Sequence, residues 1–203
     1  RQAVMLFEDS EGGYGGRGRG NMSTLLELNG VSVGDNLQNE MFVLTSSRLM
    51  ERVADSLNLD VSYTTTERLH PIALYGKKPF SVEFLEEYKK PVSFTVELVD
   101  DNSCRLSAFV AKGKEHEGSQ VVKFGEFVKT PAGTLKVEKG ETFVGFPKDK
   151  EIQVSRVSNK IAGNICKGKV TASEYDKDCS LVALTCQDVN PKRAEDILNE
   201  VYN

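Results

Sequence analysis

The chain has 203 residues, enough for one large domain or two small ones. Hydrophobic residues make up 39% and charged residues 28%, so the chain can bury a globular core. The net charge is -4 and the sequence pI is about 5.4, without a long run of Lys and Arg. This charge balance argues against nucleic acid as a main partner, because binding a polyphosphate needs clustered cations.

No apolar stretch reaches the roughly 18 residues of a membrane-spanning helix, so we expect none within the chain. The chain starts without an initiator Met or a basic-then-apolar leader. It ends inside the helical pattern "AEDILNEVYN". We therefore expect it to be a segment of a longer protein, whose other parts could include membrane anchors.

The N-terminal segment predicts a strand followed by a flexible run. Residues 3–9 ("AVMLFED") are a short apolar run, typical of a buried strand. Residues 12–20 ("GGYGGRGRG") contain six glycines and predict a mobile surface loop. The run lacks the closing Gly-Lys-Ser/Thr of a phosphate loop, so we do not expect nucleotide binding. Arg17 and Arg19 could still contact an anionic partner.

Two helices and a strand are expected next, after a possible helical turn or two over 23–30. Either Asp35 or Asn36 can cap the first helix, and either Ser46 or Ser47 the second. The apolar positions of the two helices are Leu37, Met41 and Leu44, then Met50, Val53, Ala54 and Leu57. The polar face of the second carries Arg48, Glu51, Arg52 and Asp55. Residues 59–66 then alternate as a half-buried strand does, with Val61 and Tyr63 on one side.

The middle of the chain predicts short antiparallel strands. Residues 70–80 read as a connector because prolines and glycine interrupt them. We expect strands over 80–85, 92–100, 104–113, 120–130, 133–140 and 151–157. A hairpin turns at 100–102, and the block as a whole indicates a small sandwich or barrel.

The C-terminal segment returns to mixed structure. We expect a weak helix over 155–166, strands over 169–175 and 179–188, and a helix over 189–203. Asn190 caps the last helix and Pro191 occupies its first turn. Its apolar face is made by Ala194, Ile197, Leu198 and Val201.

The order of elements predicts an α+β fold, in which a mixed sheet with packed helices is interrupted by a small antiparallel all-β insertion. The strands over 3–9, 59–66, 169–175 and 179–188 are expected to form the mixed sheet. Residues 1–70 and 155–203 would then form a base domain, and residues 71–154 the insertion.

The residues that carry most protein chemistry do not form a recognisable site in the sequence. The cysteines are Cys104, Cys166, Cys179 and Cys186, without a C-x-x-C pair, which argues against a zinc site. A Cys166–Cys179 bridge and buried free thiols both stay open. Cys179 and Cys186 would lie on opposite faces of one strand, so we do not expect them to pair.

Catalytic groups are also scarce. The acidic pairs Asp100-Asp101 and Glu86-Glu87 fall at predicted turns, where carboxylates are solvated. His70 lies in the connector and His116 in a charged hairpin tip, neither within a nucleophile motif. We therefore expect no catalytic residue, metal or cofactor, and a site assembled from scattered residues around either histidine is the alternative.

Two segments resemble the Wzz-type chain-length determinant domain of polysaccharide co-polymerases. Residues 37–63 are similar to that family's N-E-x-x-x-L-x-S-x-x-L-M-x-x-V signature, and residues 185–203 to its D-x-N-P-x-x-A-x-x-I-L-N strand-to-helix junction. The matching positions are Asn39, Glu40, Leu44, Ser46, Leu49, Met50 and Val53, then Asp188, Asn190, Pro191, Ala194, Ile197, Leu198 and Asn199. Residues 124–137 also look like the β segment inserted in some members.

The resemblance implies a non-enzymatic periplasmic domain, anchored to the bacterial inner membrane by helices outside this chain. Such domains form homo-oligomers and regulate the length or export of capsular or exopolysaccharide, together with the polymerase and export machinery. Within the family, the chain resembles the periplasmic part of a tyrosine autokinase. The chain has neither Walker motifs nor a tyrosine-rich tail, so any kinase domain would lie elsewhere.

Two sets of surface residues follow as candidate contacts. We expect Glu40, Arg48, Arg52 and Asp55 to face neighbouring subunits. A rival interpretation is a carbohydrate-binding module, in which the β insertion holds glycan through Tyr75, Tyr88 or Phe109.

Overall fold

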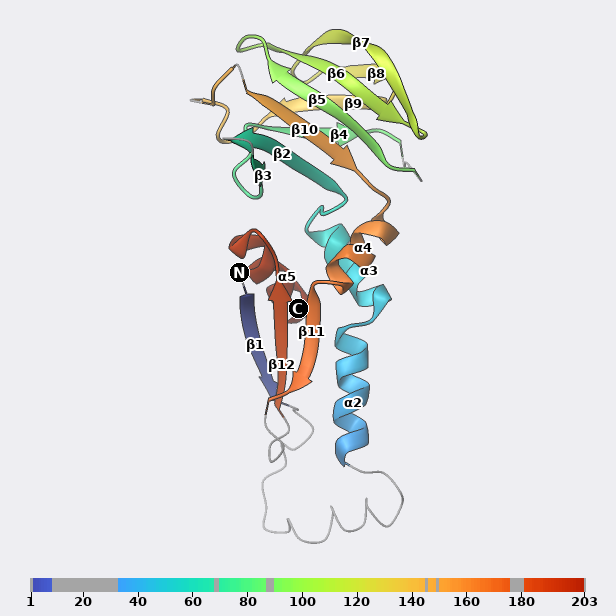
Figure 1. The fold of residues 1–203 in the computed structure, drawn as a ribbon, viewed down its shortest axis with the longest axis vertical. Coiled ribbons are helices and arrows are strands. Elements are labelled where there is room, and N and C mark those ends of the chain that lie inside the picture. The colour runs from blue at the N-terminus through green and yellow to red at the C-terminus, as the bar shows by residue number, and fades with distance from the viewer. Residues whose placement is uncertain are drawn as a thin grey trace. The chain divides into compact units, whose positions relative to one another are not determined.

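The computed structural model describes residues 2–8, 33–67, 70–86, 90–144, 146–148, 150–175 and 181–202. The chain has an α+β fold and divides into two compact units (Figure 1). Unit 1 comprises residues 1–57 and 163–203, and unit 2 comprises residues 58–162. The predicted turns over 23–30 and the glycine-rich run lie outside the described residues.

Unit 1 is built on a three-stranded antiparallel sheet in the order β1-β12-β11. These strands are β1 (Gln2–Glu8), β11 (Val170–Glu174) and β12 (Leu181–Gln187). The first strand of the chain thus pairs with one near its end, with Gln2 opposite Gln187 and Glu8 opposite Leu181. The prediction that residues 3–9, 169–175 and 179–188 share a sheet is confirmed.

The prediction of a mixed sheet is wrong. β1 and β11 run in the same direction, but β12 lies between them, so each described pair in this sheet is antiparallel. The strand expected over 59–66 does not join this sheet. It is β2 (Val61–Glu67), and it pairs with β3 and β10 in unit 2. Alternating burial sets which face of a strand is apolar but not which neighbour it pairs with.

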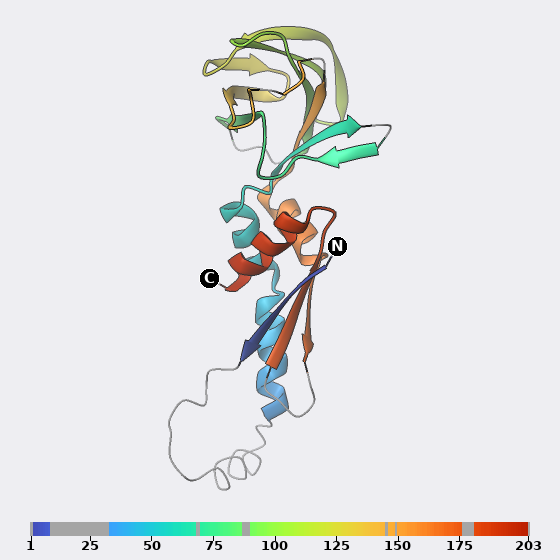
Figure 2. The same cartoon turned by 90° about the vertical axis from the view of Figure 1, so that its left-hand side faces the viewer.

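Four helices are described: α2 (Val33–Leu44), α3 (Ser47–Ser56), α4 (Asn159–Lys167) and α5 (Pro191–Tyr202). In unit 1, α5 packs on β1 and β12, and α3 packs against α5. Figure 2 shows α5 along one face of the sheet. The boundary between the two units falls within α4, after Ala162.

The caps of two helices confirm sequence predictions. Ser46 is the N-cap of α3, and its hydroxyl accepts a hydrogen bond from the Leu49 N–H at 3.3 Å. The Asn190 side chain accepts one from the Arg193 N–H at 3.1 Å. The buried faces of α3 and α5 are Met50, Val53 and Ala54, and Ala194, Ile197, Leu198 and Val201, as the apolar spacing predicts.

The start of α2 differs from the prediction. The helix begins at Val33, so Asp35 and Asn36 lie inside its first turn instead of capping it. Asp is favoured in the first turn as well as at the cap, so its presence does not fix the first residue of a helix.

Unit 2 consists of two antiparallel sheets around one core. The larger has the order β3-β2-β10-β5-β6-β7, and the smaller β4-β9-β8. Their remaining strands are β3 (His70–Ala73), β4 (Phe80–Phe84), β5 (Val92–Leu98), β6 (Ser103–Ala111), β7 (Lys114–Lys123), β8 (Phe127–Thr130), β9 (Gly133–Lys139) and β10 (Glu151–Arg156). Its largest fully buried side chains include Phe80, Phe94, Leu106, Leu135 and Ile152.

Two local predictions for unit 2 are wrong. Residues 70–73 of the expected connector form the edge strand β3. His116 lies within β7, because the hairpin turns earlier, at Lys112 and Gly113. Both of these turn residues have positive φ, of 55° and 75°, which is uncommon for lysine and explains why the sequence does not signal the turn.

Candidate functional site

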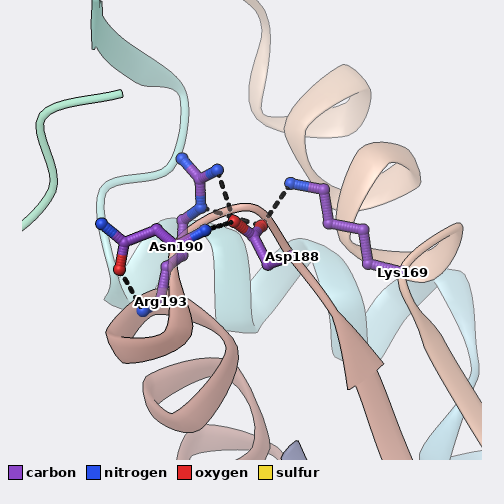
Figure 3. Close-up of polar contacts among 4 residues, drawn as sticks. All are labelled: Lys169, Asp188, Asn190 and Arg193. Atoms are coloured by element: carbon purple, nitrogen blue, oxygen red, sulfur yellow. Dashed lines mark hydrogen bonds and ion pairs between the residues drawn. The ribbon is translucent and has the colours of Figure 1, made fainter. Parts of the chain in front are cut away.

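The junction between β12 and α5 holds a buried carboxylate between two cations (Figure 3). The Asp188 side chain is fully buried, at 0% exposure. Lys169 Nζ donates to its Oδ2 at 2.6 Å, and Arg193 donates from Nε to Oδ2 at 2.9 Å and from Nη2 to Oδ1 at 2.7 Å. The Asn190 backbone N–H donates to Oδ1 at 2.8 Å.

These contacts join three elements of unit 1. Lys169 immediately precedes β11, Asp188 follows β12, and Arg193 lies in the first turn of α5. The Gln187 N–H donates to the Lys169 carbonyl at 2.9 Å, which brings the lysine beside Asp188. The chain reverses at Asn190, whose side chain caps the helix. The junction therefore fixes the direction in which α5 leaves the sheet.

The electrostatics of the junction keep the carboxylate ionised. Burial by itself raises the pKa of Asp188, but the hydrogen bonds from Arg193, Lys169 and the Asn190 N–H outweigh it and lower the pKa from 3.8 to about 2. At neutral pH this group is an anion that accepts hydrogen bonds, so it cannot serve as a general acid there. Its geometry suits a positioning role.

The outer surface of α3 carries the residues expected to contact neighbouring subunits. Arg48, Arg52 and Asp55 are exposed, as predicted. Glu51 is half-buried, because α3 passes α4 so closely that a Cβ on Gly163 would lie 2.6 Å from Glu51 Cγ. Glu40 is half-buried on α2. Three of the four charged residues predicted to contact neighbouring subunits are therefore exposed to solvent, and all three lie on α3.

The residues proposed to hold glycan are not gathered in the described structure. The prediction for Phe109 is wrong: it is 4% exposed and stacks on Phe94 in the core of unit 2, with ring centroids 5.5 Å apart. Tyr75 is half-buried in the segment after β3. Tyr88, Arg17 and Arg19 lie outside the described residues.

The two histidines lie on β3 and β7, at opposite edges of the six-stranded sheet, and both are exposed. Neither histidine lines the open pocket of about 610 Å³ in unit 2. It is lined by Asp100, Asp101, Asn102, Ser103, Val121, Val122, Lys123 and Lys148. The acidic pair at its rim is exposed to solvent, as predicted from its place in a turn.

Both carboxylates of this acidic pair have partners: Asp100 accepts hydrogen bonds, and Asp101 forms an ion pair. The pKa of Asp100 is lowered by hydrogen bonds from the Asn102 N–H and the Ser103 hydroxyl. The pKa of Asp101 is lowered by Lys148, whose Nζ lies 2.9 Å from Oδ1. Among the described residues, His, Cys, Asp and Glu side chains do not form a group of three that could hold a metal ion. None of the described helices is long and apolar enough to cross a membrane.

Sequence reasoning identified Asp188 and Asn190 but missed Lys169 and Arg193 as their partners. The arginine could have been found, because it lies in the first turn after a recognised cap. The lysine depends on the register of the β11–β12 hairpin, which no turn motif in the sequence fixes. No protein-family model matches this chain, and no curated protein sequence matches it.

Proposed function

We propose that this chain is a non-enzymatic periplasmic domain of a Wzz-type polysaccharide co-polymerase. The full-length protein is anchored in the bacterial inner membrane and regulates the length or export of capsular or exopolysaccharide. It acts as a homo-oligomer, together with the polymerase and export machinery. A tyrosine kinase domain, where one is fused, lies outside this chain.

One observation carries this proposal. The positions that match the family's motifs, within residues 39–53 and 188–199, are far apart in the sequence, yet both sets belong to unit 1, where α3 packs against α5. Residues 58–63, at the end of the first segment, belong to unit 2. The polar residues of the second motif have a defined structural role, since Asp188 and Asn190 hold the strand-to-helix junction. The pairing of β1 with β12 further supports a base domain built from both ends of the chain.

The surface of α3 suggests how the subunits meet. Its exposed Arg48, Arg52 and Asp55 can form polar contacts with a neighbouring copy. Such contacts are individually weak and sensitive to salt. Anchoring in one membrane raises the effective concentration of the subunits, so weak contacts are sufficient for assembly.

Charge reversal in the full-length protein tests the proposal. Arg48→Glu combined with Arg52→Glu should shift the oligomer, sized in detergent after cross-linking in the membrane, toward smaller species. A matched control, Lys114→Glu with Lys129→Glu, makes the same change in net charge at exposed positions of unit 2. If the α3 variant assembles like the wild type, or the control is equally defective, the assembly role of α3 is wrong.

A further inference from the structure

Two buried thiols of unit 1 act electrostatically on one another and are affected by Asp188. Cys166 lies in the last turn of α4 and is 3% exposed, and Cys186 lies on β12 and is 0% exposed. Both are free cysteines. The sequence left both a Cys166–Cys179 bridge and buried free thiols open, and Cys179 lies outside the described residues.

The backbone path from α4 into β11 brings Cys166 toward Cys186. The Lys169 N–H donates to the Cys166 carbonyl at 2.9 Å, which closes a tight turn at the end of the helix. Val170, the next residue, starts β11 and is the cross-strand partner of Cys186. Directly opposed residues of an antiparallel pair have Cβ atoms about 5 Å apart and share one face of the sheet.

Cys186 belongs to the buried face of the unit 1 sheet. Cys186 alternates with the buried Val182 and Leu184 on β12, on the face opposite the half-buried Ala183 and Thr185. Val170 is also buried. Cys166, in the last turn of α4, is buried as well.

The same charged side chains act on both thiols. Burial raises the pKa of both thiols, and that of Cys186 reaches about 11, with further contributions from Asp188 and Cys166. Lys169 and Arg193 counteract the burial of both thiols. Since the thiolate is the nucleophile in disulfide exchange, each thiol must lose its proton before it attacks.

We propose that Cys166 and Cys186 form a disulfide when the chain folds in the presence of a small-molecule disulfide such as oxidised glutathione. The Cys166 thiolate attacks one sulfur of glutathione disulfide, which forms a mixed disulfide and releases one glutathione thiolate. Cys186 then loses its proton and attacks the Cys166 sulfur, which releases the second glutathione. Two protein thiols are oxidised and one glutathione disulfide is reduced to two thiols.

The bond would link α4 directly to the central strand of the unit 1 sheet. It would close a loop that contains β11 and the residues of β12 up to Cys186. A crosslink of this kind restricts the unfolded chain, so it stabilises the folded unit. This inference concerns the chain's own chemistry and does not depend on the proposed function.

Peptide mapping after refolding tests the proposal. Cleavage after Lys and Arg places Cys166 in peptide 161–167, but leaves Cys179 and Cys186 together in peptide 178–192. The test therefore uses Cys179→Ala, refolded in a glutathione redox buffer, alkylated and digested. We expect the two peptides to be linked, with a mass about 2 Da below their sum for the two hydrogens lost. The linked fraction should be several-fold higher than in the same buffer with denaturant.

Two outcomes overturn the proposal. One is full alkylation of Cys166 and Cys186 in the refolded Cys179→Ala chain. The other is a linked fraction equal to that of the denatured chain, which would indicate random pairing. The control is Cys104, a buried thiol on β6 of unit 2. Its peptide should be recovered alkylated and not linked to another peptide. A preferred link between Cys104 and Cys166 would likewise contradict the assigned pair.

Discussion

Replacing Asp188 with Asn should destabilise unit 1 selectively. The substitution keeps the size of the side chain, and the amide oxygen can still accept a hydrogen bond from the Asn190 N–H. It removes the negative charge that Lys169 and Arg193 share. The two cations are then left next to each other without their common partner.

The structure gives two routes to the magnitude. The pKa of Asp188 falls from 3.8 to about 2, which corresponds to about 2 kcal/mol of stability at neutral pH. Removing one partner of a fully buried ion pair costs about 3–5 kcal/mol. Lys169 and Arg193 keep 28% and 17% of their side-chain surface exposed, so they recover part of their hydration. We therefore expect a loss of about 2–3 kcal/mol.

The pH dependence has a defined sign. Because the folded state lowers the pKa of Asp188, the carboxylate stabilises the fold fully above the unfolded value near 3.8. This contribution is lost as the pH falls toward about 2. The difference in stability between wild type and Asp188→Asn should therefore be largest at neutral pH and shrink in acid.

Hydrogen–deuterium exchange resolves the two units and is the appropriate assay. At neutral pH a loss of about 2 kcal/mol speeds exchange through opening of unit 1 by about 30-fold. The amides of unit 2 should be unchanged. The control is Asp101→Asn, an exposed carboxylate paired with Lys148, whose loss should cost less than about 0.5 kcal/mol. Wild-type exchange rates across β12 and α5 in the Asp188 variant would refute the reasoning.

Two further predictions concern close packing and a buried hydroxyl. Gly163→Ala would bring a Cβ within 2.6–2.9 Å of side-chain and backbone atoms of Glu51, whereas the new Cβ of the control Gly168→Ala meets its nearest atoms at 3.6–3.7 Å. The thermal unfolding midpoint of Gly163→Ala should therefore lie well below that of Gly168→Ala. Equal midpoints would contradict the close approach of α3 and α4. Tyr63→Phe leaves the Val82 N–H without the phenolic oxygen 2.9 Å away and should cost unit 2 about 1–2 kcal/mol in urea unfolding. Burial raises the pKa of Tyr63 to about 12, so the stability that its neutral phenol contributes to the wild type should be lost as the pH rises from about 10 to 12. A spectroscopic titration in which every tyrosine ionises near pH 10 would contradict the burial of this phenol.

Local signals in the sequence were sufficient for some elements. Asn190 indicated the start of α5, and the choice between Ser46 and Ser47 placed the start of α3 to within one residue, because a capping side chain acts within three residues of itself. Alternation along 92–98 identified a strand buried on one face, and its hairpin with β6 followed from the turn at Asp100.

Long-range pairing was beyond local signals. The placement of β2 beside β10 joins residues more than eighty positions apart, and its apolar alternation fits either sheet equally well. The turn at Lys112 was missed because lysine rarely takes a positive φ. The candidate site shows the same division: Asp188 and Asn190 are visible in one short motif, but Lys169 reaches them only through hairpin register.

The length distribution of the surface polysaccharide tests the central claim most directly. It should be measured by gel electrophoresis of polymer from cells whose only copy of the full-length protein carries Arg48→Glu and Arg52→Glu. The proposed role predicts polymer that is still made, with a distribution displaced from that of wild type and of the Lys114→Glu, Lys129→Glu control. The contradicting result has two parts. The variant cells make polymer of wild-type length, and so do cells that lack the protein altogether. Together these results would contradict a role in chain-length regulation.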